Sequence, residues 1–250
     1  MTHLSETASF GFSDIPADEK QGKVQGLFSN VAHKYDIMND IMSFGQHRLW
    51  KNMFINQMKP RPNKHYLDVA GGTGDIALRI ADKIGSGKTI TVLDLTHNML
   101  VEGVKRLDKH NADIQRICGD AENLPFADNS FDYYTISYGI RNVTHIDTVL
   151  SEAYRVLKQG GKFMCLEFST VSLPLLKKLY DAYSFHVLPQ MGKVFVNDAD
   201  SYRYLAESIR RFPNQNKFMD MMQQAGFKHT TYHNISGGIT CIHSGFKSIL

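Results

Sequence analysis

The sequence contains little cysteine, with only Cys118, Cys165 and Cys241 among its 250 residues. The three cysteines are odd in number, lie far apart and form no C-x-x-C pair. This distribution argues against a disulfide scaffold and against a cysteine-ligated zinc site, and it fits a reducing compartment. We therefore expect a cytoplasmic protein.

Long apolar runs and a strong net charge are also missing. No stretch reaches the roughly 18–20 apolar residues that span a bilayer, and the polar segment 1–14 lacks the basic and apolar regions of a signal peptide. The net charge is only +3, whereas nucleic-acid binders usually carry a larger, clustered basic excess. We expect no membrane span, no signal peptide and no nucleic-acid partner.

The overall composition is that of a globular protein, with 42% hydrophobic and 21% charged residues. Apolar periodicity predicts strands over 65–70, 89–94, 114–118, 131–137 and 162–168, and helices over 75–84, 98–109 and 146–157. This alternation predicts an α/β fold with a doubly wound, Rossmann-like, mostly parallel sheet. Strands over 227–235 and 239–246, joined at Gly237-Gly238, predict a C-terminal antiparallel hairpin that brings the sheet to seven strands.

Helical segments lie before and inside this pattern. After a mobile polar arm over 1–20, the spacing predicts helices over 24–35, 36–43, 47–58, 173–188, 201–211 and 213–225. In the last of these, we expect Pro213 in the first turn and Gly226 as the C-terminal cap. We expect one domain: an arm and helical lid (1–64), a cofactor-binding core (65–170), a helical insertion on the substrate side (171–226) and the closing hairpin (227–250).

A glycine-rich turn follows the first core strand, in the stretch Leu67-Asp-Val-Ala-Gly-Gly-Thr-Gly-Asp75. Gly72 and Gly74 allow a tight turn and a close ligand approach to the next helix, and their spacing also satisfies a dinucleotide-binding pattern. Asp68 decides between the ligands, because a carboxylate repels a pyrophosphate and attracts a protonated amino group. The turn therefore favours S-adenosylmethionine.

Polar residues follow the next strands as well. Asp94 is placed to accept both ribose hydroxyls, and Asp120 with the backbone of Ala121 to bind the adenine edge. Ligands of open α/β sheets lie at the carboxyl ends of the strands, near the point where the strand order reverses. We therefore expect Ser137 to face the cofactor, and Arg141 and Asn142 to face the neighbouring substrate space.

Longer stretches carry a more specific resemblance. They are Tyr35-Asp-Ile-Met-Asn-Asp-Ile-Met-Ser-Phe-Gly-Gln-His-Arg-Leu-Trp-Lys51 and Tyr154-Arg-Val-Leu-Lys-Gln-Gly-Gly-Lys-Phe-Met-Cys-Leu-Glu-Phe-Ser169, together with 181–189 and 197–210. Through them the chain resembles class I S-adenosylmethionine-dependent methyltransferases, and among these the UbiE-type C-methyltransferases. The stretches 35–51 and 181–210 are the most specific, whereas the glycine turn is generic to methyltransferases. The resemblance implies S-adenosyl-L-methionine as cofactor, with Thr73 added to Asp94, Asp120, Ala121 and Ser137 as its ligands. It implies a polyprenylated benzoquinol or a demethylmenaquinol as substrate.

Carbon methylation requires a ring carbon made nucleophilic by a phenolate, aligned with the methyl group. Arg141 is the first candidate for stabilising the phenolate, Asn142 for orienting a ring oxygen, and Tyr35 is a weaker candidate. No metal is needed. The base stays open between His186, His47 and a water molecule.

The apolar segments 173–188 and 37–58 are the candidates for lining a channel for the prenyl tail. Lys177-Lys178 and Arg210-Arg211 would favour an anionic membrane surface. Peripheral contact with the inner face of the membrane, contact with a quinone-biosynthesis complex and homodimer formation are left open.

Four other functions remain at this stage. An NAD-dependent oxidoreductase would share the glycine turn, but Asp68 and the closing hairpin argue against it. The intact turn and Arg141-Asn142 argue against a non-catalytic scaffold of a quinone-biosynthesis complex. The modest charge disfavours an RNA methyltransferase, and another small-molecule methyltransferase stays as an alternative.

Overall fold

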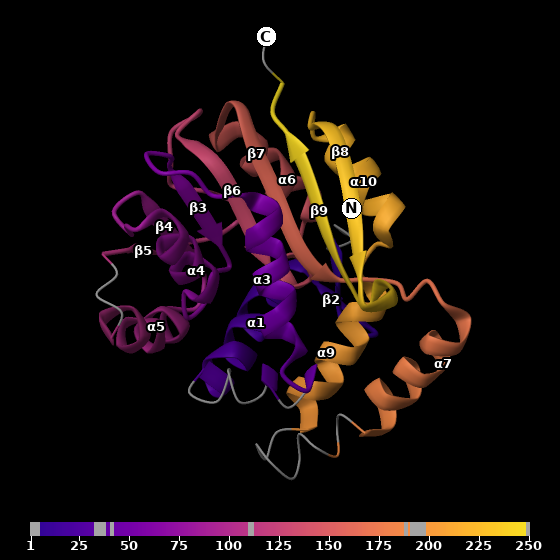
Figure 1. Ribbon diagram of the computed structural model, residues 1–250. Coiled ribbons are helices and arrows are strands. Elements are labelled where there is room, and N and C mark those ends of the chain that lie inside the picture. Colours follow the sequence, from indigo (N-terminus) through magenta and orange to yellow (C-terminus); the bar gives the residue numbers. More distant parts are fainter. Residues whose placement is uncertain are drawn as a thin grey trace, which may run out of the picture.

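A seven-stranded sheet forms the centre of the molecule in the computed structural model (Figure 1). The structure describes residues 6–32, 39–40, 43–109, 113–187, 190 and 199–248. In sequence order the strands are β3 (Tyr66–Val69), β4 (Ile90–Asp94), β5 (Gln115–Cys118), β6 (Phe131–Ser137), β7 (Leu157–Phe168), β8 (Lys228–Ile235) and β9 (Thr240–Phe246). The order across the sheet is β5-β4-β3-β6-β7-β9-β8; β3 to β7 run parallel, and β9 is antiparallel to β7 and β8. The predicted fold class is confirmed.

Helices cover both faces of this sheet, because its central strands are buried throughout and present apolar side chains to each side. The helices that follow strands are α4 (Asp75–Ile84), α5 (His97–Lys109), α6 (Ile146–Val156) and α10 (Gln215–Gln224). One core cluster joins the sheet to α6 and α10, for example through Val149 and Phe218. The other joins it to α4 and to α3 (Gln46–Met58), through residues such as Ile80 and Phe54.

The strand order reverses between β3 and β6, which are parallel neighbours. The first residue after each of them has a left-handed backbone, with φ of 50° at Ala70 and 57° at Tyr138. Such a conformation is strained for residues other than glycine. A Cβ added at Gly139 would collide with Ala70, so glycine is needed where the two loops pass each other. A crevice for ligands is expected at this reversal.

The N-terminal segment differs from the predicted mobile arm, which is wrong from Thr7 onward. Two short strands, β1 (Thr7–Phe10) and β2 (Ser13–Pro16), pair as a hairpin and lead directly into α1 (Ala17–Val31). The hairpin is held against α9 (Ala199–Arg211), where the Phe10 ring packs 4.5 Å from that of Tyr204. This support comes from a helix almost 200 residues away, which local sequence cannot reveal.

Helix α1 lies across the carboxyl ends of the parallel strands (Figure 1). Lys20 Nζ donates to the Val143 carbonyl at 2.7 Å, and Gln25 Nε2 donates to the Leu95 carbonyl at 3.1 Å. These bonds tie α1 to the loops after β6 and β4. The helix therefore covers the edge of the sheet where the predicted site residues gather.

The remaining elements refine the predictions at their ends. The long helix predicted over 173–188 is α7 (Pro174–Ala182), continued by the π-helical turn η3 (Tyr183–Val187). Pro213 precedes α10 instead of entering its first turn, because Asn214 is the N-cap and accepts a hydrogen bond from the Lys217 amide at 3.0 Å. Short 3₁₀ turns, η2 (Ile140–Asn142) and η4 (Ser236–Gly238), complete the fold. Most of the helix predicted over 36–43 lies outside the described residues.

Candidate active site

Two adjoining cavities lie at the carboxyl ends of the strands. The first, which we call the strand-end cavity, has a volume of about 120 Å³ and is walled by the loops after β3, β4, β5 and β6, with α1 over it. The second, the helical cavity, has a volume of about 270 Å³ and is walled mainly by α1, α3, α7 and α9. Phe28, Lys51 and Tyr138 line both cavities, so the two share a wall.

The predicted site residues separate between these cavities. Those lining the strand-end cavity are Asp68, Gly72, Thr73, Asp94, Asp120, Ala121, Ser137 and Asn142. Arg141 lines the helical cavity instead. Gly74 lines neither of them; it is the N-cap of α4, with a left-handed φ of 78°. Tyr35 lies outside the described residues.

Asp68 is fully buried at the centre of the sheet, opposite Thr135 of β6. Thr135 Oγ1 donates to Asp68 Oδ1 at 2.8 Å, and Oδ2 has no hydrogen-bond partner in the described part of the chain. Burial raises the pKa of Asp68 to about 7, because the charged form loses its hydration. A buried carboxylate oxygen without a partner would gain from a bound cationic group.

Asp94 shapes the glycine turn itself. Its Oδ2 accepts a hydrogen bond from the Gly72 amide at 2.8 Å, and its Oδ1 accepts one from the Thr96 amide at 2.8 Å. Burial raises the pKa of this carboxyl, against the opposing effect of the two amides. Asp94 therefore fixes the turn whether or not its remaining lone pairs bind a ligand.

At the far end of the strand-end cavity, Asp120 connects a strand-end loop to α1. Its Oδ2 accepts from Gln21 Nε2 at 2.7 Å and its Oδ1 from the Glu122 amide at 2.8 Å. Glu122, which the sequence reasoning missed, binds the amides of Thr144 and His145. The turn over 120–122 is thus hydrogen-bonded to α1 through Asp120 and to the loop at 144–145 through Glu122.

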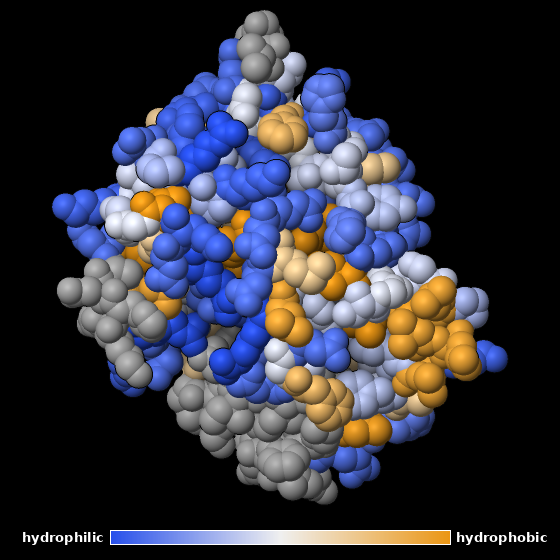
Figure 2. Space-filling model, in the orientation of Figure 1, coloured by the Kyte–Doolittle hydropathy of each residue, from blue (hydrophilic) through white to orange (hydrophobic). Residues whose placement is uncertain are grey.

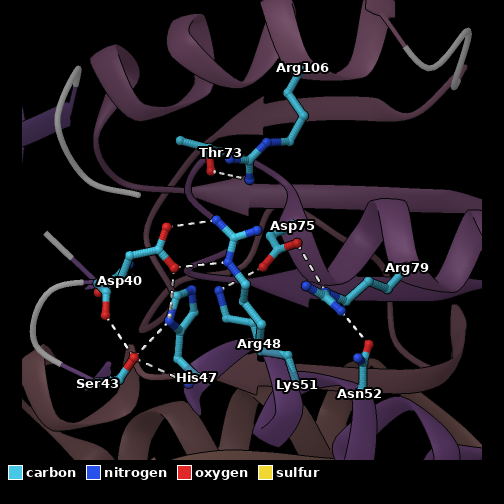
Figure 3. Close-up of polar contacts among 11 residues, drawn as sticks. Asp40, Ser43, His47, Arg48, Lys51, Asn52, Thr73, Asp75, Arg79 and Arg106 are labelled. Carbon is cyan, nitrogen blue, oxygen red and sulfur yellow. Dashed lines mark hydrogen bonds and ion pairs between the residues drawn. The ribbon is translucent and has the colours of Figure 1, made fainter. Parts of the chain in front are cut away.

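Two hydroxyl groups of the strand-end cavity differ in their partners. The Ser137 Oγ is buried and has no hydrogen-bond partner among the described residues. The Thr73 Oγ1 accepts from Arg106 Nη1 at 2.9 Å (Figure 3). Ser137 is therefore open to a ligand, whereas Thr73 has its hydroxyl engaged and still offers its backbone.

Arg141 forms a buried ion pair that the sequence did not predict. Its Nη1 donates to Glu167 Oε1 at 2.8 Å and to the Tyr138 carbonyl at 2.6 Å, and both charged side chains are at most 6% exposed. Burial raises the pKa of Glu167, and the charge of Arg141 opposes that shift. The Nε atom of Arg141 is buried without a partner in the described part of the chain. Beside it, Asn142 Oδ1 accepts from the Tyr204 hydroxyl at 3.1 Å.

Of the two histidines considered as bases, only His47 lines the helical cavity; His186 is exposed on η3 and lines neither cavity. His47 Nδ1 lies 2.8 Å from Ser43 Oγ (Figure 3). Burial, together with the nearby charge of Lys51, lowers the pKa of His47 to about 4. Its imidazole is therefore neutral at physiological pH.

Lys51, a further residue that the sequence reasoning missed, occupies the shared wall. Its Nζ donates to Asp75 Oδ2 at 2.7 Å, and Arg79 Nε donates to the other oxygen of the same carboxylate at 3.0 Å (Figure 3). The side chain of Lys51 is 9% exposed. The sequence stretch that carried the family resemblance ends at this lysine, which is the one signal that could have singled it out.

Comparison with solved structures identifies the class of fold. The chain superposes on an S-adenosylmethionine-dependent methyltransferase from Thermotoga maritima, described as a possible histamine N-methyltransferase, with a TM-score of 0.65 and 21% identity over 90% of this chain and 100% of that one. It also superposes on phosphoethanolamine N-methyltransferase 2 of Haemonchus contortus in complex with S-adenosyl-L-methionine, with a TM-score of 0.59 and 17% identity over 80% of this chain and 52% of that one. The fold is the Rossmann-like fold of these methyltransferases.

Sequence comparison narrows the class to a family. The model of the ubiE/COQ5 methyltransferase family matches residues 16–247. Proteins named ubiquinone/menaquinone biosynthesis C-methyltransferase UbiE are 54% identical in Roseobacter denitrificans, over 97% of this chain and 98% of that one, and 54% identical in Brucella anthropi, over 96% and 92%. The chain belongs to the ubiE/COQ5 methyltransferase family, which confirms the predicted resemblance.

Proposed function

We propose that this enzyme methylates a ring carbon of a polyprenylated benzoquinol, a demethylmenaquinol or both, with S-adenosyl-L-methionine as the methyl donor. The observation that carries the proposal is the convergence of the predicted cofactor residues, all except Gly74, on one cavity that shares a wall with a larger apolar one. Family membership and the names of the relatives give the reaction class and the substrate.

The strand-end cavity fits the cofactor on its own chemistry. The free oxygen of Asp68 suits an ammonium group, and the free hydroxyl of Ser137 suits a polar ligand atom. Asp94 and Asp120, at successive strand ends, suit the ribose and adenine, which carry no phosphate. The acidic lining opposes a dinucleotide pyrophosphate, so it does not favour the NAD-dependent alternative.

In the reaction, the bound cofactor supplies a methyl group on a positively charged sulfur atom. Arg141 stabilises the phenolate of the substrate with its guanidinium, whose Nε has no hydrogen-bond partner among the described residues. Glu167 and the Tyr138 carbonyl hold the guanidinium in place from the other side. Asn142 was expected to face the substrate space but lines the strand-end cavity. Its Oδ1 accepts from the hydroxyl of Tyr204, which lines the helical cavity, so we propose that its amide group orients a ring oxygen at the border of the two cavities.

We infer that His47 accepts the proton of the ring hydroxyl. It is the only one of the two candidate histidines in the helical cavity, and its low pKa keeps it neutral. A pKa of about 4 makes it a weak base, so the proton leaves readily only when Arg141 also lowers the pKa of the ring hydroxyl. The histidine and the arginine would therefore act together.

The helical cavity is proposed to hold the quinol ring and the first part of its tail. Its wall includes apolar and aromatic residues from elements far apart in sequence, such as Trp50, Phe168, Leu176 and Leu205. The segments 6–64 and 171–226 contribute most of this wall, which supports their role as a substrate lid over the core.

The outer face of α7 is proposed to contact an anionic lipid surface. None of its residues is buried, and apolar side chains gather there (Figure 2), with Leu175 74% and Leu179 62% exposed. Leu179 also lines the helical cavity, so the exposed apolar face continues into the proposed tail site. Lys177 and Lys178 add positive charge beside the leucines. No helix in the described part of the chain is long and apolar enough to cross a membrane.

Two measurements test the proposed reaction. The purified protein is titrated with S-adenosylmethionine and with NAD, and is then incubated with S-adenosylmethionine and a reduced demethylated quinol. We expect binding of the first ligand only and a product heavier by one methylene group, as seen by mass spectrometry. In a strain lacking its quinone methyltransferase, the gene should restore methylated quinones. Cofactor binding without methyl transfer would instead favour the scaffold alternative.

A further inference from the structure

The strand-end cavity carries an unbalanced set of charges. Its lining contains five acidic residues, Asp68, Asp75, Asp94, Asp120 and Glu122. Among the described lining residues, Lys51 is the single basic side chain. Arg106 contacts Thr73 but does not line the cavity, and Arg79 contacts Asp75 from outside it. Among the described lining residues, Lys51 is therefore the one cation that could pair with an anionic group of a bound ligand.

S-adenosylmethionine brings such a group, because its amino-acid part carries a carboxylate next to the ammonium. The ammonium is accounted for by the free oxygen of Asp68. A carboxylate placed close to that ammonium would face Asp68 and Asp75 at short range, which is unfavourable without a counter-charge. Lys51 is bonded to Asp75, the first residue of α4, and so stands at the same end of the cavity as Asp68 and the glycine turn.

We propose that the Lys51 ammonium binds the carboxylate of the cofactor, an inference that rests on the proposed cofactor and adds a residue outside the glycine turn. One of its three N–H groups is used for Asp75, and within the described part of the chain the other two remain for a ligand. Arg79 also forms an ion pair with Asp75, so the Asp75 carboxylate is neutralised by two cations. Lys51 therefore keeps part of its positive charge for a ligand. The side chain is only 9% exposed, which strengthens a charge-assisted hydrogen bond.

The proposal gives α3 a second role. His47 and Lys51 are four residues apart, on one face of α3, and both line the helical cavity. The helix that would accept the substrate's proton would thus also hold the amino-acid end of the cofactor. Binding the cofactor would fix the wall between the two cavities before the quinol enters.

The test uses two ligands that differ by the carboxylate alone: S-adenosylmethionine and decarboxylated S-adenosylmethionine. Their dissociation constants are measured by calorimetry, without any quinol, for the wild type, Lys51→Met and Arg79→Met. Arg79→Met is the matched control, since it removes the other cation from the same Asp75. Melting temperatures of the ligand-free proteins report on folding.

In the wild type we expect tighter binding of the ligand that has the carboxylate. Lys51→Met should weaken S-adenosylmethionine by about 10- to 100-fold, the size of a lost charge-assisted hydrogen bond. It should change the affinity for the decarboxylated ligand by less than about threefold, so the preference is lost. Arg79→Met should keep the wild-type preference.

Two outcomes would overturn the proposal. One is an equal loss of affinity for both ligands in Lys51→Met, which would mean a structural role. The other is an unchanged preference for the carboxylate in that variant. If the wild type bound neither ligand, the proposed cofactor itself would fail, and this result is distinct from both.

Discussion

The two cavities of this enzyme are built in opposite ways. The strand-end cavity takes its polar groups from loops that each follow a strand of one sheet, within residues 68–144 apart from contributions of α1 and α3. The helical cavity takes its walls from α1, α3, α7 and α9 and from single residues of the sheet, spread from Leu27 to Ile239. The first can bind a small, polar, charged ligand at fixed points, and the second offers apolar area of less defined shape. The two meet at Lys51 and Tyr138, beside Arg141, and we propose that methyl transfer takes place there.

This contrast predicts that a substitution in the helical cavity should lower turnover and leave cofactor binding unchanged, and the reverse for the strand-end cavity. The largest effect is expected at Arg141. We expect Arg141→Ala to lower kcat by about 100- to 1,000-fold, as seen when a group that stabilises an anion is removed. The dissociation constant of S-adenosylmethionine should change by less than about threefold, because Arg141 does not line the strand-end cavity. Steady-state kinetics and calorimetry measure the two quantities.

The same variant also leaves Glu167 buried without its partner, which costs about 3–5 kcal/mol of stability. The double variant Arg141→Met/Glu167→Gln serves as the control, since it removes both charges. It should recover most of the lost stability in urea unfolding and still lack turnover. A double variant that recovered turnover would show that Arg141 serves only the fold.

The reverse experiment targets the strand-end cavity. Asp94→Ala removes the hydrogen bonds to the Gly72 and Thr96 amides together with the proposed ribose contact. We expect the affinity for S-adenosylmethionine to fall by about 100-fold, equivalent to about 3 kcal/mol, while kcat at saturating cofactor falls far less. A larger effect on kcat than on the cofactor's dissociation constant would mean that the two cavities are not separate in function.

The sequence predicted the two cavities unequally, for a physical reason. Parallel strands end at one edge of the sheet, so Asp68, Asp94, Asp120 and Ser137 could be brought together from strand positions alone. The helical cavity depends on which remote helices pack side by side, and no local pattern encodes that. For this reason the sequence pattern places Glu167 in a strand but does not predict its ion pair with Arg141.

Partners that act through tertiary contacts were missed in the same way. The hairpin over Thr7–Pro16 is stabilised by α9, whereas its polar sequence on its own predicts a mobile arm. Helix α10 begins after Pro213 because the cap interaction of Asn214 outweighs the preference of proline for a first turn. Most element types were therefore predictable, whereas the two strands of the N-terminal hairpin and the tertiary contacts that hold it were not.

The pH dependence of cofactor binding is a further test of the strand-end cavity, because Asp68 lines it and titrates near neutral pH. Its pKa of about 7 in the ligand-free fold exceeds that of an unfolded aspartate, near 4. The folded state therefore holds the proton more tightly, and the stability contributed by protonation is lost as pH rises from about 4 through 7. A ligand ammonium needs the charged carboxylate, so S-adenosylhomocysteine, which has the same amino-acid part, should bind about tenfold more tightly at pH 8 than at pH 6.

Asp68→Asn is the matched variant for this titration. It should bind S-adenosylhomocysteine more weakly at pH 8, with little dependence on pH between 6 and 8. A pH dependence equal to that of the wild type would assign the titration to another group.

The smallest expected effect concerns the outer edge of the helical cavity. Leu175→Ser/Leu179→Ser replaces two exposed side chains of α7, so the free energy of unfolding should change by less than about 1 kcal/mol. Co-sedimentation with anionic phospholipid vesicles should fall severalfold, because about two leucine side chains of apolar contact are lost. Val101→Ser, on α5 and 47% exposed, is the control and should sediment as the wild type does. Equal loss of vesicle binding in both variants would place the lipid contact elsewhere on the molecule.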